Sequence, residues 1–467
     1  MLAVAVLGST LAYIDESVVN VALPKIEADL HTTLASMQWV INAYTLCMSA
    51  LLLIGGAAAD RFGRRKLFLV GIITFTLSSI ACGFAPTVAP LVGARAIQGV
   101  GAALLIPCSL AIIGATFDEH ERGAAIGIWS GASALAAGAG PLLAGLLIDH
   151  LSWRAIFFIN PLIAIPTLWI AVLRLPESAD PAARAGLDWL GVTLVFGGLG
   201  SLVYGLISAS TLGWRDVTVI GSLTAGALLL LGFALEERRS SAPMVPLALF
   251  ASASFSGVNL LTLFLYGALG GAFFFLPFLL VEAHGFSATA AGAVYLPFTL
   301  VLAVLSRWSG SLLDRFGARW PLIIGPVVAA AGFALLAILS GEQRYWVYLA
   351  PMTVLGFGMA ITVTPLTTTV INSVEKRATG VASGINNVVA AVASLLVIAV
   401  LGTLVANSLV ATAHVVMASA AALALAASAV TALTIPSKEE RYGAAGAGFG
   451  LREARERRTQ ATPGRRR

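Results

Sequence analysis

The sequence GAAADRFGRR at residues 56–65 returns as GSLLDRFGAR at residues 310–319, with its first Gly and its Asp, Arg, Phe and second Gly at the same spacing. Matching positions in these two stretches are 254 residues apart. Further matches follow at a separation of 257 residues: GVGAA at 99–103 with GFGMA at 356–360, and Gly123 and Gly127 with Gly380 and Gly384. The chain therefore contains two copies of one unit that run in the same direction.

Around these repeats the sequence consists of long apolar runs. It is 58% hydrophobic and only 11% charged, against roughly 25% charged in soluble domains, so a soluble protein is excluded. A helix needs about 20 apolar residues to cross a bilayer core of about 30 Å. Fourteen such spans are predicted, at about residues 2–24, 36–59, 66–85, 88–116, 122–148, 154–173, 188–208, 217–235, 254–281, 288–310, 320–340, 345–372, 379–406 and 411–435. Twelve spans are the main alternative, since the seventh and eighth can be divided differently.

Basic residues are distributed unevenly between the two sides of these spans. With both termini cytoplasmic, the cytoplasmic loops contain thirteen: Arg61, Arg64, Arg65, Lys66, Arg122, Arg174, Arg184, Arg238, Arg239, Arg315, Arg319, Lys376 and Arg377. The external loops contain four: Lys25, Arg154, Arg215 and Arg344. Because Lys and Arg gather in cytoplasmic loops, this difference favours fourteen spans with cytoplasmic termini, and it explains the net charge of +5 without a nucleic-acid surface.

Both copies of the repeated loop fall between the second and third span of a six-span unit. The sequence therefore predicts an all-α polytopic membrane protein with two parallel six-helix bundles, at residues 1–174 and 253–436. A helix pair is inserted between them at 175–252, and the basic tail at 437–467 is expected to be cytoplasmic and disordered. Two parallel halves with a site between them at the midplane are the arrangement of major facilitator transporters.

Four stretches resemble signatures of this superfamily. Residues 56–66 resemble its loop signature GxLaDrxGrkxxl, with Ala58 in place of Leu, and residues 91–103 resemble its span-4 signature. Residues 140–145, GPLLAG, resemble the antiporter signature of span 5. Residues 14–24, IDESVVNVALP, resemble the LDxTVVNVALP element of the fourteen-span drug:proton antiporter branch. The resemblance implies the major facilitator fold and drug export driven by protons.

The doubled loop is predicted to be a latch that holds one conformation and releases another. Asp60 and Asp314 lie at helix ends beside arginines, where a carboxylate can pair with a guanidinium or cap a neighbouring helix. A solvated charged loop is the alternative, but two copies with one spacing argue against it. The predicted latch residues are Gly56, Asp60, Arg61, Gly63, Arg64, Gly310, Asp314, Arg315 and Gly317.

Span 5 is rich in glycine and is predicted to contain a hinge between the halves, at Gly140, Pro141 and Gly145. Small residues let membrane helices approach closely, and a proline inside a helix bends it. Ordinary packing of small residues is the alternative, and the resemblance to the antiporter signature favours the hinge.

Three charged side chains within the spans are candidates for proton coupling. An ionised group near the bilayer centre is costly unless it faces a cavity or a partner. Asp15 and Glu16 are neighbours on one helix and point about 100° apart, so we do not expect the two side chains to face lipid together. Asp15 also matches the branch element. The resemblance implies a part in proton coupling for Arg95. A fixed salt bridge or an interfacial position is the alternative for the carboxylates, and a structural ion pair is the alternative for Arg95.

A wide cavity lined by aromatic and small side chains would bind amphiphiles with little demand on their shape. The predicted cavity residues are Asn20, Trp39, Tyr44, Gln98, Phe274, Tyr295 and Asn386, with Phe273 and Phe275 as further aromatic candidates. The alternative places these aromatic side chains against lipid or in the helix core.

No pattern in the sequence indicates an enzyme or a metal site. There is no GxxxxGK[ST] loop, HExxH motif or GxSxG elbow, and Cys47, Cys82 and Cys108 have no CxxC spacing. No cofactor is expected, and the proton gradient is the expected source of energy.

The sequence thus predicts a secondary active transporter of the cell membrane, a proton-coupled antiporter that exports amphiphilic or cationic small molecules by alternating access. An exporter of one specific metabolite is the first alternative, and a non-transporting receptor is the second. The predicted partners are the small-molecule substrate, protons and the lipid bilayer, with no nucleic acid. We expect a monomer, which would work with a periplasmic adaptor if its source has an outer membrane.

Overall fold

The computed structural model describes residues 1–179, 188–240, 243–375, 378–404 and 408–436. Of residues 119, 120, 306, 307, 311 and 314 it describes the backbone alone. In these parts of the chain, fourteen helices are long and apolar enough to cross a membrane. The predicted span count is confirmed, and the seventh and eighth spans are separate helices. The tail at 437–467, which we expect to be disordered, lies outside the described residues.

Six long helices precede the inserted pair. They are α1 (Leu2–Asp29), α2 (Leu34–Phe62), α3 (Arg64–Phe84), α4 (Val88–Thr116), α5 (Glu119–His150) and α6 (Ala155–Arg174). Between α2 and α3 the chain turns at Gly63, whose φ of +108° is a conformation that glycine adopts without the strain of a side chain. This glycine lets two spans follow each other with almost no loop.

The inserted pair consists of α7 (Trp189–Leu212) and α8 (Val217–Arg239), and the short helix η1 (Leu247–Ala251) follows it. α7 contacts α2 on one side and α14 (Thr379–Leu401) on the other. α8 packs against α7, and its buried residues are only Val219, Gly226 and Glu237. The pair therefore lies on the outside of the molecule, with α7 between α8 and the rest.

The remaining helices form the second half. They are α9 (Ala253–Phe278) with its π-helical extension η2 (Leu279–Ala283), α10 (Ala288–Ala293), α11 (Leu296–Phe316), α12 (Arg319–Ile338) with η3 (Leu339–Gly341), η4 (Tyr345–Tyr348) with α13 (Leu349–Asn372), α14 with η6 (Gly402–Leu404), and α15 (Leu409–Thr434). The predicted tenth span is thus divided into α10 and the start of α11, because the α-helix is interrupted between Ala293 and Leu296.

The sequence repeat reappears as a repeat of helix contacts. A side chain at Gly99 would collide with the backbone carbonyl of Tyr44, and one at Gly356 would lie 2.9 Å from the carbonyl oxygen of Phe298, which is 254 residues after Tyr44. The α2–α4 contact of the first half therefore corresponds to the α11–α13 contact of the second. Glycine at both positions lets the paired helices approach closely.

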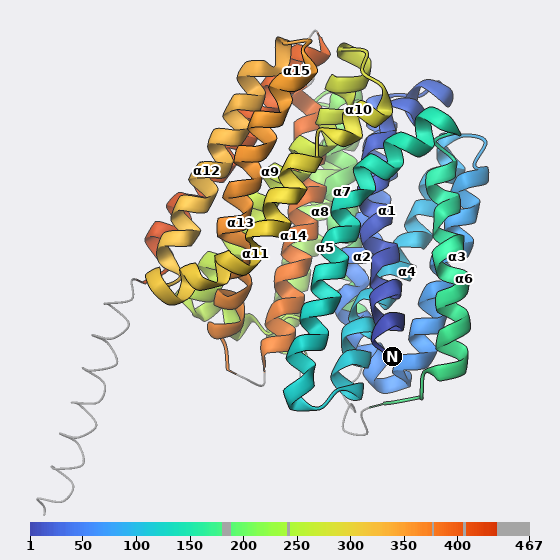
Figure 1. Ribbon diagram of the computed structural model, residues 1–467, viewed down its shortest axis with the longest axis vertical. Coiled ribbons are helices and arrows are strands. Elements are labelled where there is room, and N and C mark those ends of the chain that lie inside the picture. The colour runs from blue at the N-terminus through green and yellow to red at the C-terminus, as the bar shows by residue number, and fades with distance from the viewer. Residues whose placement is uncertain (180–187, 241–242, 376–377, 405–407, 437–467) are drawn as a thin grey trace, which may run out of the picture.

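The helices run side by side, with the N-terminus near one end of the molecule (Figure 1). We call the end that contains the α2–α3 turn the Gly63 end, and the opposite end, where α5 finishes, the Asp149 end. Successive spans cross in alternate directions, so Gly317, between α11 and α12, also lies at the Gly63 end. It has a positive φ of 72°, as Gly63 does.

Candidate functional site

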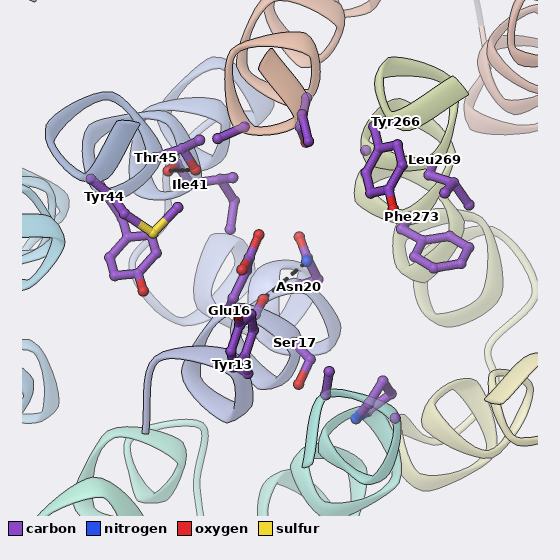
Figure 2. Close-up of a pocket in the computed structure, with 18 of the residues that line it drawn as sticks. Tyr13, Glu16, Ser17, Asn20, Ile41, Tyr44, Thr45, Tyr266, Leu269 and Phe273 are labelled. Carbon is purple, nitrogen blue, oxygen red and sulfur yellow. Dashed lines mark hydrogen bonds between the residues drawn. The ribbon is translucent and has the colours of Figure 1, made fainter. Parts of the chain in front are cut away.

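A cavity of about 460 Å³ lies between the two halves of the molecule. Helices α1, α2, α4 and α5 line it from the first half, and α9, α11 and α14 line it from the second, together with Tyr295 just before α11. Figure 2 shows Tyr13, Glu16, Asn20, Ile41 and Tyr44 from the first half around it, with Tyr266, Leu269 and Phe273 from α9 opposite. The two halves therefore share one binding space, as parallel repeats with a site between them require.

The cavity is closed toward the Asp149 end by tight contact between α5 and the α10–α11 segment. The carboxylate of Asp149 accepts hydrogen bonds from the backbone N–H groups of Ala288 at 3.1 Å and Thr289 at 2.7 Å. One turn earlier, a side chain at Gly145 would collide with the carbonyl of Ala288, and one at Gly292 would collide with that of Pro141. The α5 backbone thus lies directly against the second half at this end.

The predicted hinge residues belong to this closed contact. Gly140 faces Ser17 of α1 so closely that a side chain at position 140 would collide with the serine hydroxyl. Gly145 faces α10, and Pro141 lies in the cavity wall between them. In this conformation the GPLLAG stretch forms a seal between α1, α5 and α10. Its role as a hinge stays a prediction.

Asp15 is a residue of α1 that faces the interior of the first half, and its side chain is completely buried. Arg95 of α4 donates through Nη1 to Asp15 Oδ2 in a buried ion pair. Gln98 Nε2 and Asn160 Nδ2 donate to Asp15 Oδ1 at 2.7 and 2.8 Å. Donors on both oxygens stabilise the charged carboxylate. The structure therefore brings together two of the three predicted coupling residues.

Arg95 connects this buried pair to the cavity. Its guanidinium carbon lies 4.2 Å from the centre of the Tyr44 ring, a cation–π distance. Arg95 Nε also donates to the carbonyl of Val40 at 3.2 Å, and Nη1 donates to Gln98 Oε1 at 2.8 Å. Arg95 and Tyr44 both line the cavity. A change in the charge of Asp15 would therefore act on the cavity through Arg95.

Glu16, the next residue after Asp15, points into the cavity (Figure 2). Its side chain is exposed, and the surface that it exposes is the cavity wall in the middle of α1. Asn20 lies one turn further along α1 and donates from Nδ2 to the backbone carbonyl of Glu16 at 3.1 Å. The carboxylate of Glu16 thus remains available to a bound molecule.

Aromatic side chains make much of the cavity wall flat and apolar. Tyr13, Tyr44, Tyr266, Phe273 and Tyr295 all line the cavity. The Phe273 and Tyr295 rings meet edge to face with centroids 5.0 Å apart, and Tyr295 Oη donates to the Phe273 carbonyl at 3.3 Å. Such rings suit the binding of flat apolar groups and of organic cations.

The structure places only part of the predicted cavity set in the wall. Asn20, Tyr44 and Tyr295 line the cavity, and so does the further candidate Phe273. The other four predicted residues lie elsewhere, together with Phe275, which is buried in the helix core. Trp39, Gln98, Phe274 and Asn386 each contact a different neighbouring side chain.

Trp39 packs against Tyr204 of α7, with ring centroids 6.3 Å apart. Phe274 is buried against Phe278 in the core of the second half. Gln98 belongs to the Asp15 cluster described above. None of these three side chains belongs to the cavity wall.

Asn386 also faces a helix, because its Nδ2 donates to Asn259 Oδ1 at 3.1 Å and Thr262 Oγ1 at 2.8 Å on α9. Its neighbour Asn387 lines the cavity. Adjacent residues on a helix point about 100° apart, so Asn386 faces α9 while Asn387 faces the cavity.

The first copy of the predicted latch is an ordered turn at the Gly63 end. Asp60 pairs with Arg64, with Oδ1 and Nη2 2.8 Å apart. Glu177 accepts hydrogen bonds from the backbone N–H groups of Arg65 at 3.1 Å and Lys66 at 3.3 Å, and so caps the start of α3. A Cβ atom built on Gly56 would lie 3.5 Å from Pro107 Cβ on α4, an ordinary van der Waals distance. The turn is thus held by the Asp60–Arg64 pair and by Glu177, which follows α6.

The second copy repeats several of these features. Arg65 donates to the carbonyl of Val172 at 2.7 Å, and Arg319, its counterpart, donates to that of Ala432 at 3.0 Å. The guanidinium carbons of Arg61 and Arg315 each lie 5.3 Å from the ring of the following phenylalanine. No described atom lies within 4 Å of a Cβ atom built on Gly310. The side chain of Asp314 lies outside the described residues.

Sequence reasoning missed Asn160, Ser79, Glu177 and Asp149. Asn160 Nδ2 donates to Ser79 Oγ at 2.9 Å as well as to Asp15, but neither residue belongs to a stretch that resembles a family signature. Two polar residues inside otherwise apolar spans were the available signal, since such residues usually have a partner. Glu177 and Asp149 lie at span ends, where an acidic residue is ordinary.

The comparisons with known proteins agree with this architecture. Residues 5–398 match the sequence model of the Major Facilitator Superfamily. The chain is 36% identical over 408 residues to the tetracenomycin C resistance and export protein of Streptomyces glaucescens, covering 87% of this chain and 76% of that protein. It is 35% identical over 407 residues to the multidrug resistance protein Stp of Mycobacterium tuberculosis, covering 87% and 75%. It is 37% identical over 407 residues to a puromycin resistance protein of Streptomyces alboniger, covering 86% and 80%.

Solved structures share the fold at low sequence identity. A peptide transporter POT in complex with sulfate matches with a TM-score of 0.70 and 16% identity, covering 92% of this chain and 93% of that one. A D-xylose–proton symporter matches with a TM-score of 0.68 and 16% identity, covering 93% and 97%. These structures show the fold. The sequence model over residues 5–398 and the relatives at 35–37% identity show that the chain, a multi-pass membrane protein, belongs to the Major Facilitator Superfamily.

Proposed function

We propose that this chain is a proton-coupled antiporter that exports amphiphilic or cationic small molecules by alternating access. One observation carries the proposal: two adjacent carboxylates in the middle of α1 have separate surroundings. Asp15 is paired with Arg95 inside the first half, and Glu16 faces the cavity. The first can respond to protons, and the second can contact cargo.

The known relatives support export as the direction of transport. Their names describe resistance to tetracenomycin C and to puromycin, or multidrug resistance, and one name includes export. The names thus refer to more than one compound. A cavity with flat aromatic walls and few polar groups fits such variety, because it makes little geometric demand on its ligand.

The charges around the cavity suggest how protons and cargo are linked. When both carboxylates are ionised, Asp15 and Glu16 contribute two negative charges and Arg95 contributes one positive charge, so the group has one net negative charge. A cationic molecule would neutralise it. A proton on Asp15 would also neutralise this net negative charge, because the positive charge of Arg95 would then be balanced by Glu16 alone. Proton and cation therefore compete for one charge, and exchange of the two follows from their competition.

We infer that the Gly63 end is cytoplasmic, which the distribution of basic loop residues supports. The conformation described here, with α5 sealed against α10 at the Asp149 end, would then be loaded from the cytoplasm. We take residues 1–174 and 253–436 as the two moving halves and the doubled loop as the latch that closes the Gly63 end. The transporter would act as a monomer in the cell membrane, with a periplasmic adaptor if the source has an outer membrane.

Flux measurements in proteoliposomes test this proposal. Ethidium, a flat aromatic monocation, would be driven across the membrane by an imposed pH gradient, and a protonophore would abolish that flux. A voltage clamp by potassium and valinomycin separates a response to pH from a response to membrane potential. Ethidium movement that ignores the pH gradient, or no movement for any of a panel of amphiphiles, would contradict the proposal.

A further inference from the structure

The two seams between the halves differ in how far they are closed toward the Gly63 end. One seam joins α2 to α14, and the other joins α5 to α10 and α11. On the first, Gln38 Nε2 donates to the Ile398 carbonyl at 2.6 Å, and Leu46 packs with Leu395. Further toward the Gly63 end, a Cβ atom built on Gly384 would lie 2.9 Å from Leu53 Cδ2.

The α2–α14 seam is therefore in contact over most of the length of α2. From Gln38 to Leu53, at 1.5 Å per residue, the contact covers roughly 22 Å. The α5 seam is different. Its contacts run from Asp149 and Thr289 to Gly138, where a side chain would collide with Thr299. Beyond this point, no described atom lies within 4 Å of a Cβ atom built on Gly131, Gly127 or Gly123, and all three glycines are exposed.

The sequence repeat makes this difference a direct comparison. Gly127 on α5 corresponds to Gly384 on α14, since the two are 257 residues apart. Gly384 lies against Leu53 of the other half, whereas Gly127 is exposed and has no described atom within 4 Å of its Cβ position. Within residues 121–131 of α5, only Ala125 and Trp129 are buried. Equivalent positions in the two seams are thus closed in one and open in the other.

The inserted helix α7 lies on the closed seam. Leu199, Val203 and Ile207 of α7 form one apolar cluster with Leu46 of α2 and with Leu395 and Ala399 of α14. A Cβ atom built on Gly200 of α7 would lie 3.4 Å from Leu46 Cδ2. α7 therefore contacts both halves at once, and α8 covers its outer side. A packed apolar cluster of this kind resists separation of the helices that it joins.

We propose that α7 is a brace that keeps the α2–α14 seam closed, so that the cavity opens at the Gly63 end through the α5–α11 seam alone. An amphiphile dissolved in the leaflet at that end would enter between α5 and α11. The exposed apolar side chains of Leu135 on α5 and of Leu300 and Val304 on α11 suit such a path. This route for cargo rests on the proposed function, whereas the asymmetry of opening does not.

Distances between spin labels test the asymmetry without any transport. Cysteines at Leu53 and Gly384 report on the braced seam, and cysteines at Gly127 and Arg307, their counterparts in the repeat, report on the other. The background carries alanine at the three native cysteines, and the samples are nanodiscs at acidic and alkaline pH, with and without ethidium. We expect one unchanged distance for 53 and 384, and two populations with changing proportions for 127 and 307. Equal changes in both pairs, or none in the second, would overturn the proposal.

Two glycine substitutions test the brace itself. Gly200→Leu should push α7 away from Leu46 and broaden the distance between positions 53 and 384. Gly221→Leu on α8, which has open space around it, is the matched control and should leave that distance unchanged. If Gly200→Leu changes nothing, α7 does not hold the seam.

Ethidium flux tests the path of the cargo. Gly127→Trp should slow gradient-driven ethidium flux severalfold by narrowing the opening, and Gly221→Trp should not. Equal flux rates in Gly127→Trp and Gly221→Trp would overturn the path between α5 and α11 and would leave the proposed function intact. If the unmodified protein shows no flux, the proposed function is overturned, but the distance measurements can still be interpreted.

Discussion

Asp15 faces the interior of the first half, where Arg95 neutralises it, whereas Glu16, the next residue, faces the cavity between the halves. A helix turns about 100° between neighbours, so one peptide unit separates a buried ion pair from a cargo-facing charge. The two carboxylates should therefore be separable by mutation, one affecting coupling and the other affecting the choice of cargo.

Glu16→Gln should change cargo preference more than it changes proton coupling. The amide keeps the shape of the side chain but removes the charge that attracts a cation in a cavity of low dielectric constant. We expect ethidium to bind at least about tenfold more weakly, which corresponds to about 1.4 kcal/mol. The neutral phenanthridinone, with a similar ring system, should bind as before. Binding to the purified protein, followed by fluorescence, gives both values, and an equal loss for both ligands would contradict the role of Glu16.

Arg95→Ala should destabilise the protein, because it leaves Asp15 buried without its ionic partner. Breaking a buried pair in this way costs about 3–5 kcal/mol. The double variant Asp15→Asn with Arg95→Gln removes both charges, so we expect it to regain most of the lost thermal stability in detergent while remaining uncoupled. A stable Arg95→Ala protein, or no recovery in the double variant, would show that the two side chains are not energetically paired.

Asp149→Asn should weaken the seal at the Asp149 end. The carboxylate accepts two backbone N–H groups from α10, and an amide can accept only on its oxygen while its NH₂ group faces a donor. We expect a cysteine placed at the cavity residue Thr45 to react faster with an impermeant maleimide added from the Asp149 side. Asp216→Asn is the matched control, because Asp216 accepts from Thr218 within its own helix cap. The same rate in both variants would exclude a sealing role for Asp149.

Asp60→Asn should slow transport with little loss of stability. Asp60 and Arg64 are partly exposed, and exposed pairs contribute only about 0–1 kcal/mol. A large effect on transport would therefore come from the balance between conformations. Asp314→Asn should act in the same way, since position 314 is the counterpart of position 60 in the repeat. Wild-type transport rates in both variants, at normal thermal stability, would contradict the latch.

The fold followed from the sequence because its determinants are local and repeated. Span number depends on the length of apolar runs, and the parallel arrangement depends on the doubled loop, as at Gly63 and Gly317. The cavity wall was less predictable. α2 is apolar and buried on most sides, so nothing in its own sequence indicates that Tyr44 faces cargo while Trp39 faces α7.

The polar contacts between helices were the least predictable part of the site. Asn160 and Asp15 are 145 residues apart, and their contact depends on how α6 crosses α1. Asp149 acts through the backbone of α10, whose N–H groups carry no sequence signal. Such contacts become visible only when the helices are placed in space.

Proton-driven flux through Asp15→Asn tests most directly whether the Asp15–Arg95 pair couples transport to protons. The amide preserves volume but cannot titrate. In proteoliposomes with an imposed pH gradient, Asp15→Asn should retain phenanthridinone binding, release no protons when ligand binds, and show no gradient-driven flux. Full gradient-driven flux with normal proton release in Asp15→Asn would contradict this assignment and would place the proton site on another residue.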